Sequence, residues 1–492
     1  MPISYQAPYL DLEACKTFSK SQENLSLSLR TARGYENLDS EQIIAKIQER
    51  KPDAEQFITS QHSIDSLPFL LHDQNGMSIT LNGNHLKGSG SITIENCRDF
   101  ILTAHGTCSL SQTDKFFLKI SNCHNFIVRG LRTNGGQHTL MITDSKLFSV
   151  IQLQSEDGQG YGIIIFNSCN FTLEHCRIEN NLAGIMVVGR SQQGGISNCS
   201  ISRLRGFCNC DAGVHLCATS RAITPEDLPE RCHEPLPIDQ KTWRPQAILI
   251  HRTTCYDCRA QGIYLEGAVN CLIQSNMLIN NNKEGICFDW GSCFNIFVEN
   301  AVTLNGERRG LSEEEIRVDF ITRYPLLEDG SSSMKLPGIS IDNGCMNLIA
   351  ANKIASNYGG GIKMIRSAIL NSIYKNSILA NNIGNNRFVP PFHGISVLGV
   401  GAGTQEFTKG KNTLLDFLPS EANLISDNVI RENGYPIFLD SRCRKNIIRD
   451  NSIGKNPACI NNKTILKKKI SAFLRRWFWR YFRIPAKKQP TS

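Results

Sequence analysis

The chain has 492 residues and a formal net charge of +8 at pH 7. Residues 451–492 hold 11 lysines and arginines and no acidic residue, and subtracting these 11 charges leaves −3 for the first 450 residues. This distribution excludes a basic nucleic-acid-binding surface on the body of the protein, so we expect no nucleic-acid partner. The sequence contains no run of 18 or more apolar residues, so we expect no membrane-spanning helix.

The first 75 residues do not repeat and predict an N-terminal cap region. Within them, residues 39–50 have the pattern of an amphipathic helix with acidic residues at its start. We expect this helix to cover the first rung of a repeat structure, because an open end would expose unpaired strand edges. The N-terminus lacks the basic and apolar segments of a secretory signal, which favours a cytoplasmic protein whose 19 cysteines are free thiols.

A short strand-like motif, Gly-Ile-x-φ-x with φ apolar, recurs in the part of the chain that follows. The spacing is 22 residues from Gly162 to Gly184 and 23 residues from Gly262 to Gly285. Repeats of this length are typical of solenoids. Strand-like segments without the leading glycine begin at about residue 76, and the pattern ends near residue 462. Copies of the motif begin at Gly162, Gly184, Gly213 (with Val in place of Ile), Gly262, Gly285, Gly338, Gly361 and Gly394.

Turns that contain Asn and Cys follow the strands, as at Asn96-Cys97 and Asn122-Cys123. Asn tolerates left-handed backbone and can stack in ladders on neighbouring turns. Several strands per repeat without an interposed helix indicate an all-β protein, a parallel β-helix solenoid of about a dozen rungs. The pattern resembles the right-handed parallel β-helix superfamily of pectate-lyase-like and NosD-like proteins over residues 76–462.

Three segments interrupt the repeat, at residues 218–246, 305–337 and 399–421. The second contains a predicted short helix that starts near Ser312. Long insertions in a solenoid tend to gather on its binding face, so we expect these segments to act as lids.

Side chains alternate across a strand, so the Ile and φ of each motif point into the coil and the two x positions point out of it. On successive rungs the first x is His215, Tyr264, Cys287, Ser340, Lys363 and Ser396. The last x on the same rungs is Cys217, Glu266, Asp289, Asp342, Ile365 and Leu398.

Three successive rungs therefore present a carboxylate at one lateral position, from Glu266, Asp289 and Asp342. Carboxylates one rung apart would lie about 5 Å from each other, and stacked like charges resist ionisation. Two solutions are open: a Ca²⁺ ion that bridges the three acids, or one acid that stays protonated and serves as a general acid. The next rung adds Lys363, followed by Arg366. The alternative is that the acids form a solvated stripe without function.

β-helix polysaccharide enzymes have their sites on this strand face, and the resemblance implies three chemistries. In a lyase, the three carboxylates would hold Ca²⁺ or neutralise the substrate carboxylate, and Lys363 or Arg366 would remove the C5 proton of a uronate. An epimerase of this fold uses Tyr, His and Asp, which Tyr264, His215 and Asp289 match. A hydrolase would use the carboxylates alone. The chain lacks the Asp-Pro-His-Asp of epimerases and the Asn-Thr-Asp and Gly-His-Gly of polygalacturonase-like hydrolases, so no subfamily is assigned.

Seven of the 19 cysteines lie between Cys199 and Cys258. The Cys-x-Cys at Cys208 and the Cys-x₂-Cys at Cys255 are spacings that could hold Zn²⁺. Cysteines also recur at turns outside this region, where they fill small buried spaces. We therefore favour turn residues for the cysteines of this segment, and a zinc site stays open as the alternative.

The tail at residues 463–492 predicts an amphipathic helix with aromatic residues on one face. Ten basic residues lie between Lys463 and Lys488. Two roles are open for this helix: contact with an anionic membrane surface through residues 463–488, or a cap on the last rung.

We therefore expect a carbohydrate-active β-helix protein with lyase or epimerase chemistry on a glycan bound along the strand face between Gly213 and Arg366. No cofactor other than Ca²⁺ is expected. The alternative is a non-catalytic β-helix scaffold that binds glycan or protein at a membrane surface. The fold alone does not distinguish the two, because function depends on the residues of the site.

Overall fold

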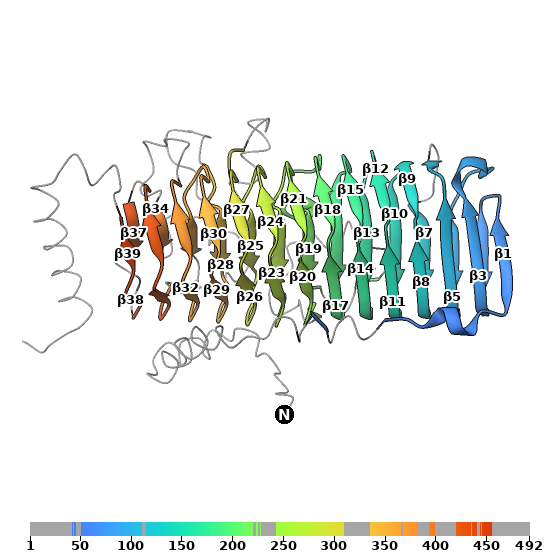
Figure 1. Cartoon of the computed structure of the whole chain (residues 1–492), viewed down its shortest axis with the longest axis horizontal. Coiled ribbons are helices and arrows are strands. Elements are labelled where there is room, and N and C mark those ends of the chain that lie inside the picture. Colours follow the sequence, from blue (N-terminus) through green and yellow to red (C-terminus); the bar gives the residue numbers. More distant parts are fainter. Residues whose placement is uncertain are drawn as a thin grey trace, which may run out of the picture.

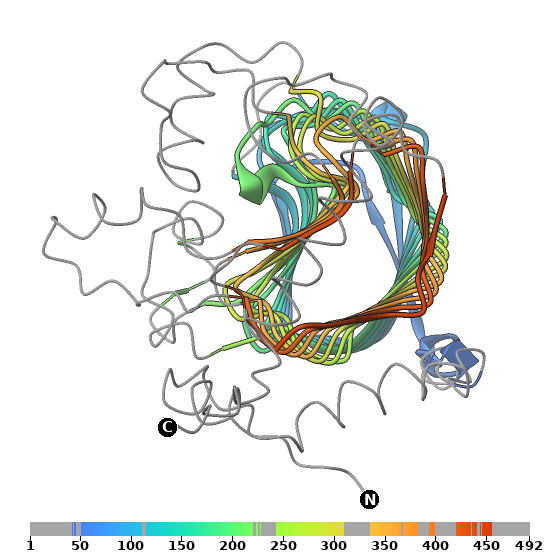
Figure 2. The ribbon, with the colours of Figure 1, turned by 90° about the vertical axis from the view of Figure 1, so that its left-hand side faces the viewer.

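The computed structural model of the protein describes residues 51–110, 115–219, 243–308, 335–365, 368–381, 393–398, 420–433, 435–439, 443 and 445–454, and the single positions 42, 44, 45, 223, 224 and 227. Its strands form three parallel sheets that run the length of a rod (Figure 1). From Arg98 onward, each turn of the coil adds one strand to each sheet, and neighbouring strands in a sheet come from successive turns. Viewed along the rod, the sheets form the walls of one coil (Figure 2).

The sheets are named here by their number of strands. The thirteen-stranded sheet contains β2 (Phe69–His72), β4 (Ile92–Glu95), β7 (Phe116–Ser121), β10 (His138–Thr143), β13 (Tyr161–Phe166), β16 (Ala183–Val188), β19 (Val214–Cys217), β22 (Ile263–Glu266), β25 (Ile286–Asp289), β28 (Ile339–Asp342), β31 (Ile362–Ile365), β34 (His393–Val397) and β37 (Tyr435–Leu439). The fourteen-stranded sheet contains β1 (Ser60–Ile64), β3 (Asn75–Asn82), β5 (Arg98–His105), β8 (His124–Arg129), β11 (Lys146–Ile151), β14 (Cys169–Glu174), β17 (Gln192–Ser197), β20 (Leu249–His251), β23 (Leu272–Gln274), β26 (Ile296–Val298), β29 (Leu348–Ala350), β32 (Ser372–Tyr374), β35 (Leu424–Ser426) and β38 (Ile447–Arg449). The twelve-stranded sheet contains β6 (Cys108–Leu110), β9 (Arg132–Gly135), β12 (Gln154–Glu156), β15 (Arg177–Glu179), β18 (Ser200–Ser202), β21 (Thr254–Tyr256), β24 (Met277–Ile279), β27 (Ala301–Thr303), β30 (Lys353–Ala355), β33 (Ser377–Leu379), β36 (Val429–Arg431) and β39 (Ser452–Ile453). Three short 3₁₀ turns join them: η2 (Ala54–Phe57), η3 (Gly83–His85) and η4 (Asn209–Asp211).

The predicted right-handed parallel β-helix of about a dozen rungs is therefore confirmed. The coil begins earlier than predicted, because β1 at Ser60 already pairs in register with β3. β1 is mostly polar, with Ile64 as its buried residue, so the apolar pattern of the later strands does not reveal it.

Apolar side chains that point into the coil form one continuous core. At the N-terminal end, the rings of Phe100, Phe126, Phe148 and Phe171 stack on successive rungs, with centroids 4.8, 4.9 and 5.5 Å apart. The stack ends at Gly194, where a Cβ would collide with the Phe171 ring.

The leading glycine of the motif has a steric cause. A Cβ on Gly213 would lie 2.5 Å from the carbonyl oxygen of Gly262 on the next rung and 2.8 Å from the sulfur of Cys255. Consecutive rungs approach each other most closely at this corner, and only glycine fits there.

The corners of the coil carry ladders of polar side chains. In the C-terminal half, each corner asparagine accepts a hydrogen bond from the backbone N–H and the Nδ2 of the asparagine on the preceding rung, as Asn347 does from Asn295 at 3.1 and 3.0 Å. In the N-terminal half, one of these corners holds Cys or Ser, with Ser145 N–H donating to Ser168 Oγ at 3.1 Å. The predicted asparagine stacking is therefore confirmed. Its three ladders contain Asn295, Asn347, Asn371, Asn423 and Asn446; Asn276, Asn300, Asn352, Asn376, Asn428 and Asn451; and Asn281, Asn305, Asn357, Asn381 and Asn433.

The structure does not support the predicted role of the helix over residues 39–50 as a cap on the first rung. Only Gln42, Ile44 and Ala45 are described, and all three are helical. Ile44 packs against an apolar cluster on the fourteen-stranded sheet that runs from Leu249 to Leu424. Ile44 therefore contacts the flank of the rod.

Most of the three predicted insertions lies outside the described residues, as do the tail at 463–492 and the predicted helix near Ser312. The first insertion is described at its base, where Thr219 and Trp243 pair in an antiparallel bridge. Ile223 and Trp243 pack on the outer face of the thirteen-stranded sheet, beside residues such as Met186 and Val188. The described residues of this insertion therefore pack on the same sheet as the predicted site.

Candidate functional site

The outer face of the thirteen-stranded sheet carries the predicted columns in register. His215 of β19 pairs with Tyr264 of β22, and Glu266 pairs with Asp289 of β25. Ser340 of β28 pairs in turn with Lys363 of β31. The sequence thus correctly predicted which residues share a surface.

These positions are buried, so the interpretation as a solvated stripe is wrong. The three carboxylate residues Glu266, Asp289 and Asp342 are 6%, 4% and 1% exposed. His215 is 0% exposed and Tyr264 is also buried, while Lys363 is half-buried. A carboxylate or imidazole held away from water has a free-energy cost that an apolar side chain at the same place would not have.

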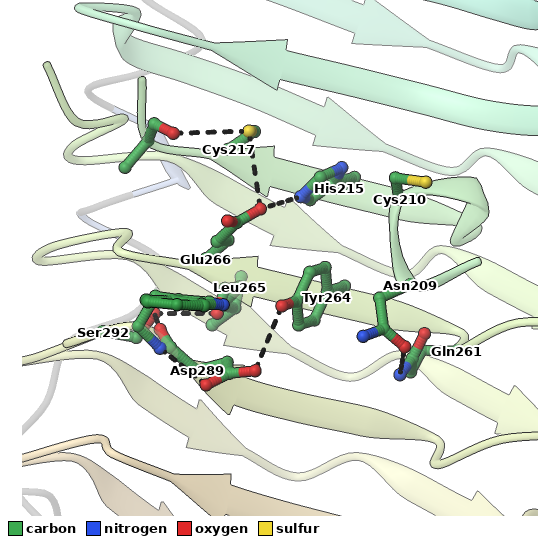
Figure 3. A network of polar contacts seen from close by, with 12 residues as sticks. Asn209, Cys210, His215, Cys217, Gln261, Tyr264, Leu265, Glu266, Asp289 and Ser292 are labelled. Atoms are coloured by element: carbon green, nitrogen blue, oxygen red, sulfur yellow. Dashed lines mark hydrogen bonds and ion pairs between the residues drawn. The ribbon is translucent and has the colours of Figure 1, made fainter. Parts of the chain in front are cut away.

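One cluster joins β19 and β22. Nε2 of His215 lies 3.1 Å from Oε2 of Glu266, and the thiol of Cys217 donates to the same oxygen at 3.5 Å (Figure 3). Burial alone would lower the pKa of His215. The Cys217 sulfur and the Glu266 carboxylate outweigh that effect and raise the pKa of His215 to about 9.

A second pair lies one strand further along. The hydroxyl of Tyr264 donates to Oδ2 of Asp289 at 3.1 Å, while the backbone N–H of Trp290 donates to Oδ1 at 2.8 Å. These two contacts hold the Asp289 carboxylate in place (Figure 3). The rings of His215 and Tyr264 face each other with centroids 4.9 Å apart. Two acid–base side chains, each next to a carboxylate, thus lie on adjacent strands.

A third polar group lies beside them, at the start of the same strands. Asn209 of η4 accepts hydrogen bonds at its Oδ1 from Nε2 of Gln261 and from Nζ of Lys283, both at 3.0 Å. Gln261 also donates to Oε2 of Glu284 at 3.1 Å. Burial raises the pKa of the neighbouring Asp211. The strand motif does not single out these residues. The charged pair Lys283-Glu284, directly before the motif glycine Gly285, is the feature of the sequence that could have pointed to them.

Not all predicted site residues are brought together. Lys363 lies on β31, three strands beyond Tyr264 on β22, which corresponds to roughly 14 Å. Arg366 lies outside the described residues. Among the described residues, the groups of three or more ligand atoms within 4.8 Å of one another do not include the Glu266, Asp289 and Asp342 set predicted for Ca²⁺. The Ca²⁺ site stays a prediction.

The cysteine-rich segment divides between the interior and the outer face. Cys199, Cys255 and Cys258 belong to the interior core, as the interpretation as turn residues predicted. Cys217 instead lies on the outer face with His215 and Glu266. All sixteen described cysteines are free thiols.

Comparisons with known proteins agree with the fold. A family model described as NosD, periplasmic copper-binding protein, matches residues 238–389, which is less than half of the chain. No curated protein sequence matches. Among solved structures, the mannuronan C-5 epimerase AlgE4 A-module from Azotobacter vinelandii is 11% identical with a TM-score of 0.45, over 77% of this chain and 88% of that chain. The catalytic domain of a GH87 α-1,3-glucanase is 10% identical with a TM-score of 0.43, over 80% of this chain and 64% of that chain.

The periplasmic alginate epimerase AlgG is 12% identical with a TM-score of 0.37, over 77% of each chain. The protein and these structures are parallel β-helices, and similarity at this level carries no argument about activity. Within the described part of the chain, no helix is both long and apolar enough to cross a membrane.

Proposed function

We propose that the protein acts on a glycan that contains uronic acid, by moving the proton at C5 of the sugar. The single observation that carries this proposal is the pairing of His215 with Glu266 and of Tyr264 with Asp289 on adjacent strands. The C5 proton of a uronate lies next to a carboxyl group, so its removal needs one base and, for epimerisation, an acid that returns a proton on the other face.

In this proposal His215 and Tyr264 exchange the proton with the substrate. Glu266 and Asp289 orient the two rings and balance the charge that develops on them. The ring centroids are 4.9 Å apart, so both rings can reach one sugar from a single strand face. His215 is fully buried, so the proposal requires this face to open when the glycan binds.

A second form of the proposal is lyase chemistry with Lys363 as the base. Lys363 lies further along the column of outward-facing residues that starts at His215. Asp342 lies on the strand that precedes Lys363, so the two could act together without the His215 pair. The products separate the two variants: a lyase forms an unsaturated uronate, and an epimerase forms none.

The experiment is proton exchange in D₂O on polymannuronate and polygalacturonate, with a neutral glucan as control, followed by NMR of the H5 signal. The expected result is deuterium at C5 with a uronan. Tyr264→Phe should slow this exchange by a factor of about 100 or more, since it removes one acid–base group. The matched control Tyr256→Phe changes an exposed tyrosine on the twelve-stranded sheet and should leave the rate unchanged.

Absence of both C5 exchange and unsaturated product with every uronan would contradict the proposal. So would exchange that Tyr264→Phe does not slow.

A non-catalytic scaffold is the second candidate, and the complete burial of His215 favours it. A protein of this kind would bind a glycan or a protein partner along its rungs without changing it. Retention of a uronan without C5 exchange would support this candidate. Membrane contact through residues 463–488 stays a prediction for residues outside the described chain.

A further inference from the structure

The His215, Cys217 and Glu266 cluster has a geometry that proton transfer does not explain. One atom of each side chain, Nε2, Sγ and a carboxylate oxygen, lies within 4.8 Å of both others. Nε2 and Sγ both approach the same oxygen, Oε2 of Glu266, at 3.1 and 3.5 Å. The three potential ligand atoms therefore form a compact group, with Nε2 and Sγ on either side of one carboxylate oxygen.

A nucleophilic triad has a different arrangement. There the thiol contacts one ring nitrogen of the histidine and the carboxylate contacts the other, so the three groups form a chain. In this cluster the thiol and the imidazole nitrogen meet at one carboxylate oxygen. Close mutual approach of three ligand-type atoms is what a metal ion requires of its ligands.

The distances fit a tetrahedral zinc site. Bond lengths of about 2.0 Å to N and O and about 2.3 Å to S, at tetrahedral angles, place N and O roughly 3.3 Å apart and S and O roughly 3.5 Å apart. The observed separations of 3.1 and 3.5 Å are close to these values. Thiolate and imidazole suit Zn²⁺ and not Ca²⁺, which prefers oxygen ligands only.

The charges also fit. His215 and Cys217 are 0% exposed, and Glu266 is 6% exposed. A neutral imidazole, a thiolate and a carboxylate carry two negative charges, which one Zn²⁺ ion neutralises. A buried cluster without net charge avoids the desolvation cost of an uncompensated ion.

We propose that His215, Cys217 and Glu266 bind one Zn²⁺ ion, or an ion of the same preference for N and S donors, on the outer face of the thirteen-stranded sheet. The three ligands leave a fourth position for water or another ligand. This site goes beyond the proposed function and does not depend on it. Where both hold, Zn²⁺ takes His215 out of proton transfer, so the metal inhibits the C5 exchange.

The test is titration of the reduced, chelator-treated full chain with Zn²⁺ by calorimetry, and with Co²⁺ by absorption. The expected result is one ion per chain, with a thiolate-to-Co²⁺ charge-transfer band. Cys217→Ser keeps the volume of the side chain and should weaken Zn²⁺ binding by a factor of 100 or more and abolish the band. Glu266→Gln should weaken binding while the band persists, because the thiolate ligand remains.

Two control variants change thiols at other positions. Cys287→Ser alters a buried thiol on the same sheet face, two residues before Asp289. Cys208→Ser alters the second group of ligand-type residues, Cys208, Cys210 and Asp211. Both variants should bind Zn²⁺ as the unchanged chain does.

Three results would overturn the proposal. The first is that the unchanged chain binds no Zn²⁺ above the level of a chelator-treated blank. The second is binding that survives in Cys217→Ser with its charge-transfer band intact. The third is a band that disappears in Cys208→Ser, which would assign the ion to the other group. None of these measurements uses turnover, so the metal site and the proposed function can fail separately.

Discussion

The two halves of the rod build the same coil with different side chains. At one corner, the N-terminal rungs use Cys and Ser, as at Cys123 and Ser145, whereas the C-terminal rungs use asparagine, as at Asn295 and Asn347. Inside the coil, a phenylalanine stack supports the N-terminal rungs only as far as Phe171. Both solutions satisfy backbone groups or fill space at each turn, so the coil tolerates either.

The outward-facing residues of the thirteen-stranded sheet also change along the rod. Strands β13 and β16 of this sheet are apolar on the outer face, with Met186 and Val188 in one cluster with Ile223. The next strands place His215 and Glu266 at equally buried positions in the same columns. Because packing alone would favour apolar residues at buried positions, we propose that the change to ionisable residues serves a function and not a structural need.

The largest effect is expected from breaking an asparagine ladder. Asn352 donates from Nδ2 to Phe297 O and to Asn376 Oδ1, both at 2.9 Å, and accepts at Oδ1 from Asn300. Asn352→Ala leaves several buried groups unpaired and should lower the free energy of unfolding by about 4 kcal/mol. Chemical denaturation measures this.

The control for the ladder is Asn134→Ala, which removes an exposed hydrogen bond to Asp157. Its expected change is within about 0.5 kcal/mol. Equal midpoints for Asn352→Ala and the control would show that the ladders do not stabilise the C-terminal half.

A smaller effect is expected at the apolar part of the outer face. Trp243 packs on the cluster that contains Met186, and the Arg190 guanidinium lies 4.2 Å from the centroid of its ring. Trp243→Ala removes both contacts and should lower the free energy of unfolding by about 2 kcal/mol. Trp243→Phe keeps most of the packing and serves as the control. If the two variants unfold at the same denaturant concentration as the unchanged chain, the insertion does not stabilise this face.

The smallest effect is expected at Asp211, next to the site. Burial raises the pKa of Asp211 above its ordinary value, so the ionised form costs stability at neutral pH. Asp211→Asn keeps an acceptor for the Cys208 N–H and should raise the free energy of unfolding at pH 7 by about 0.5 kcal/mol.

This advantage should shrink as the pH falls to about 3, below the ordinary aspartate pKa of about 3.9, where the aspartate is largely neutral in the unfolded chain as well. Denaturation curves at pH 7 and near pH 3, with exposed Asp450→Asn as control, measure the difference. An Asp211→Asn variant that is less stable at pH 7 would contradict the assignment.

The fold could be predicted because its determinants are local and repeated. The motif glycine at Gly213 marks the close approach of two rungs, and the spacing of Asn371 and Asn376 marks two corners. The first strand, β1 from Ser60, escaped prediction because it is mostly polar.

The site could be predicted only in part. Alternation gave the columns, and therefore the register of His215 with Tyr264 and of Glu266 with Asp289. Alternation places these residues on the outer face of the sheet but does not predict their burial there. The convergence of Cys217 on Glu266 depends on side-chain rotamers, which the strand pattern does not determine.

The most direct test of the central claim is the stability of a chain in which the apolar columns continue through the site. The double variant His215→Met, Glu266→Leu makes two buried positions apolar. His215 pairs with Met186 on the preceding strand, and Glu266 pairs with Cys217. If the polar pair serves function, the variant should unfold at the same or a higher denaturant concentration, as often follows when a buried ion pair is replaced by packed apolar residues. A loss of several kcal/mol would show that the pair holds the coil together, and would contradict the claim.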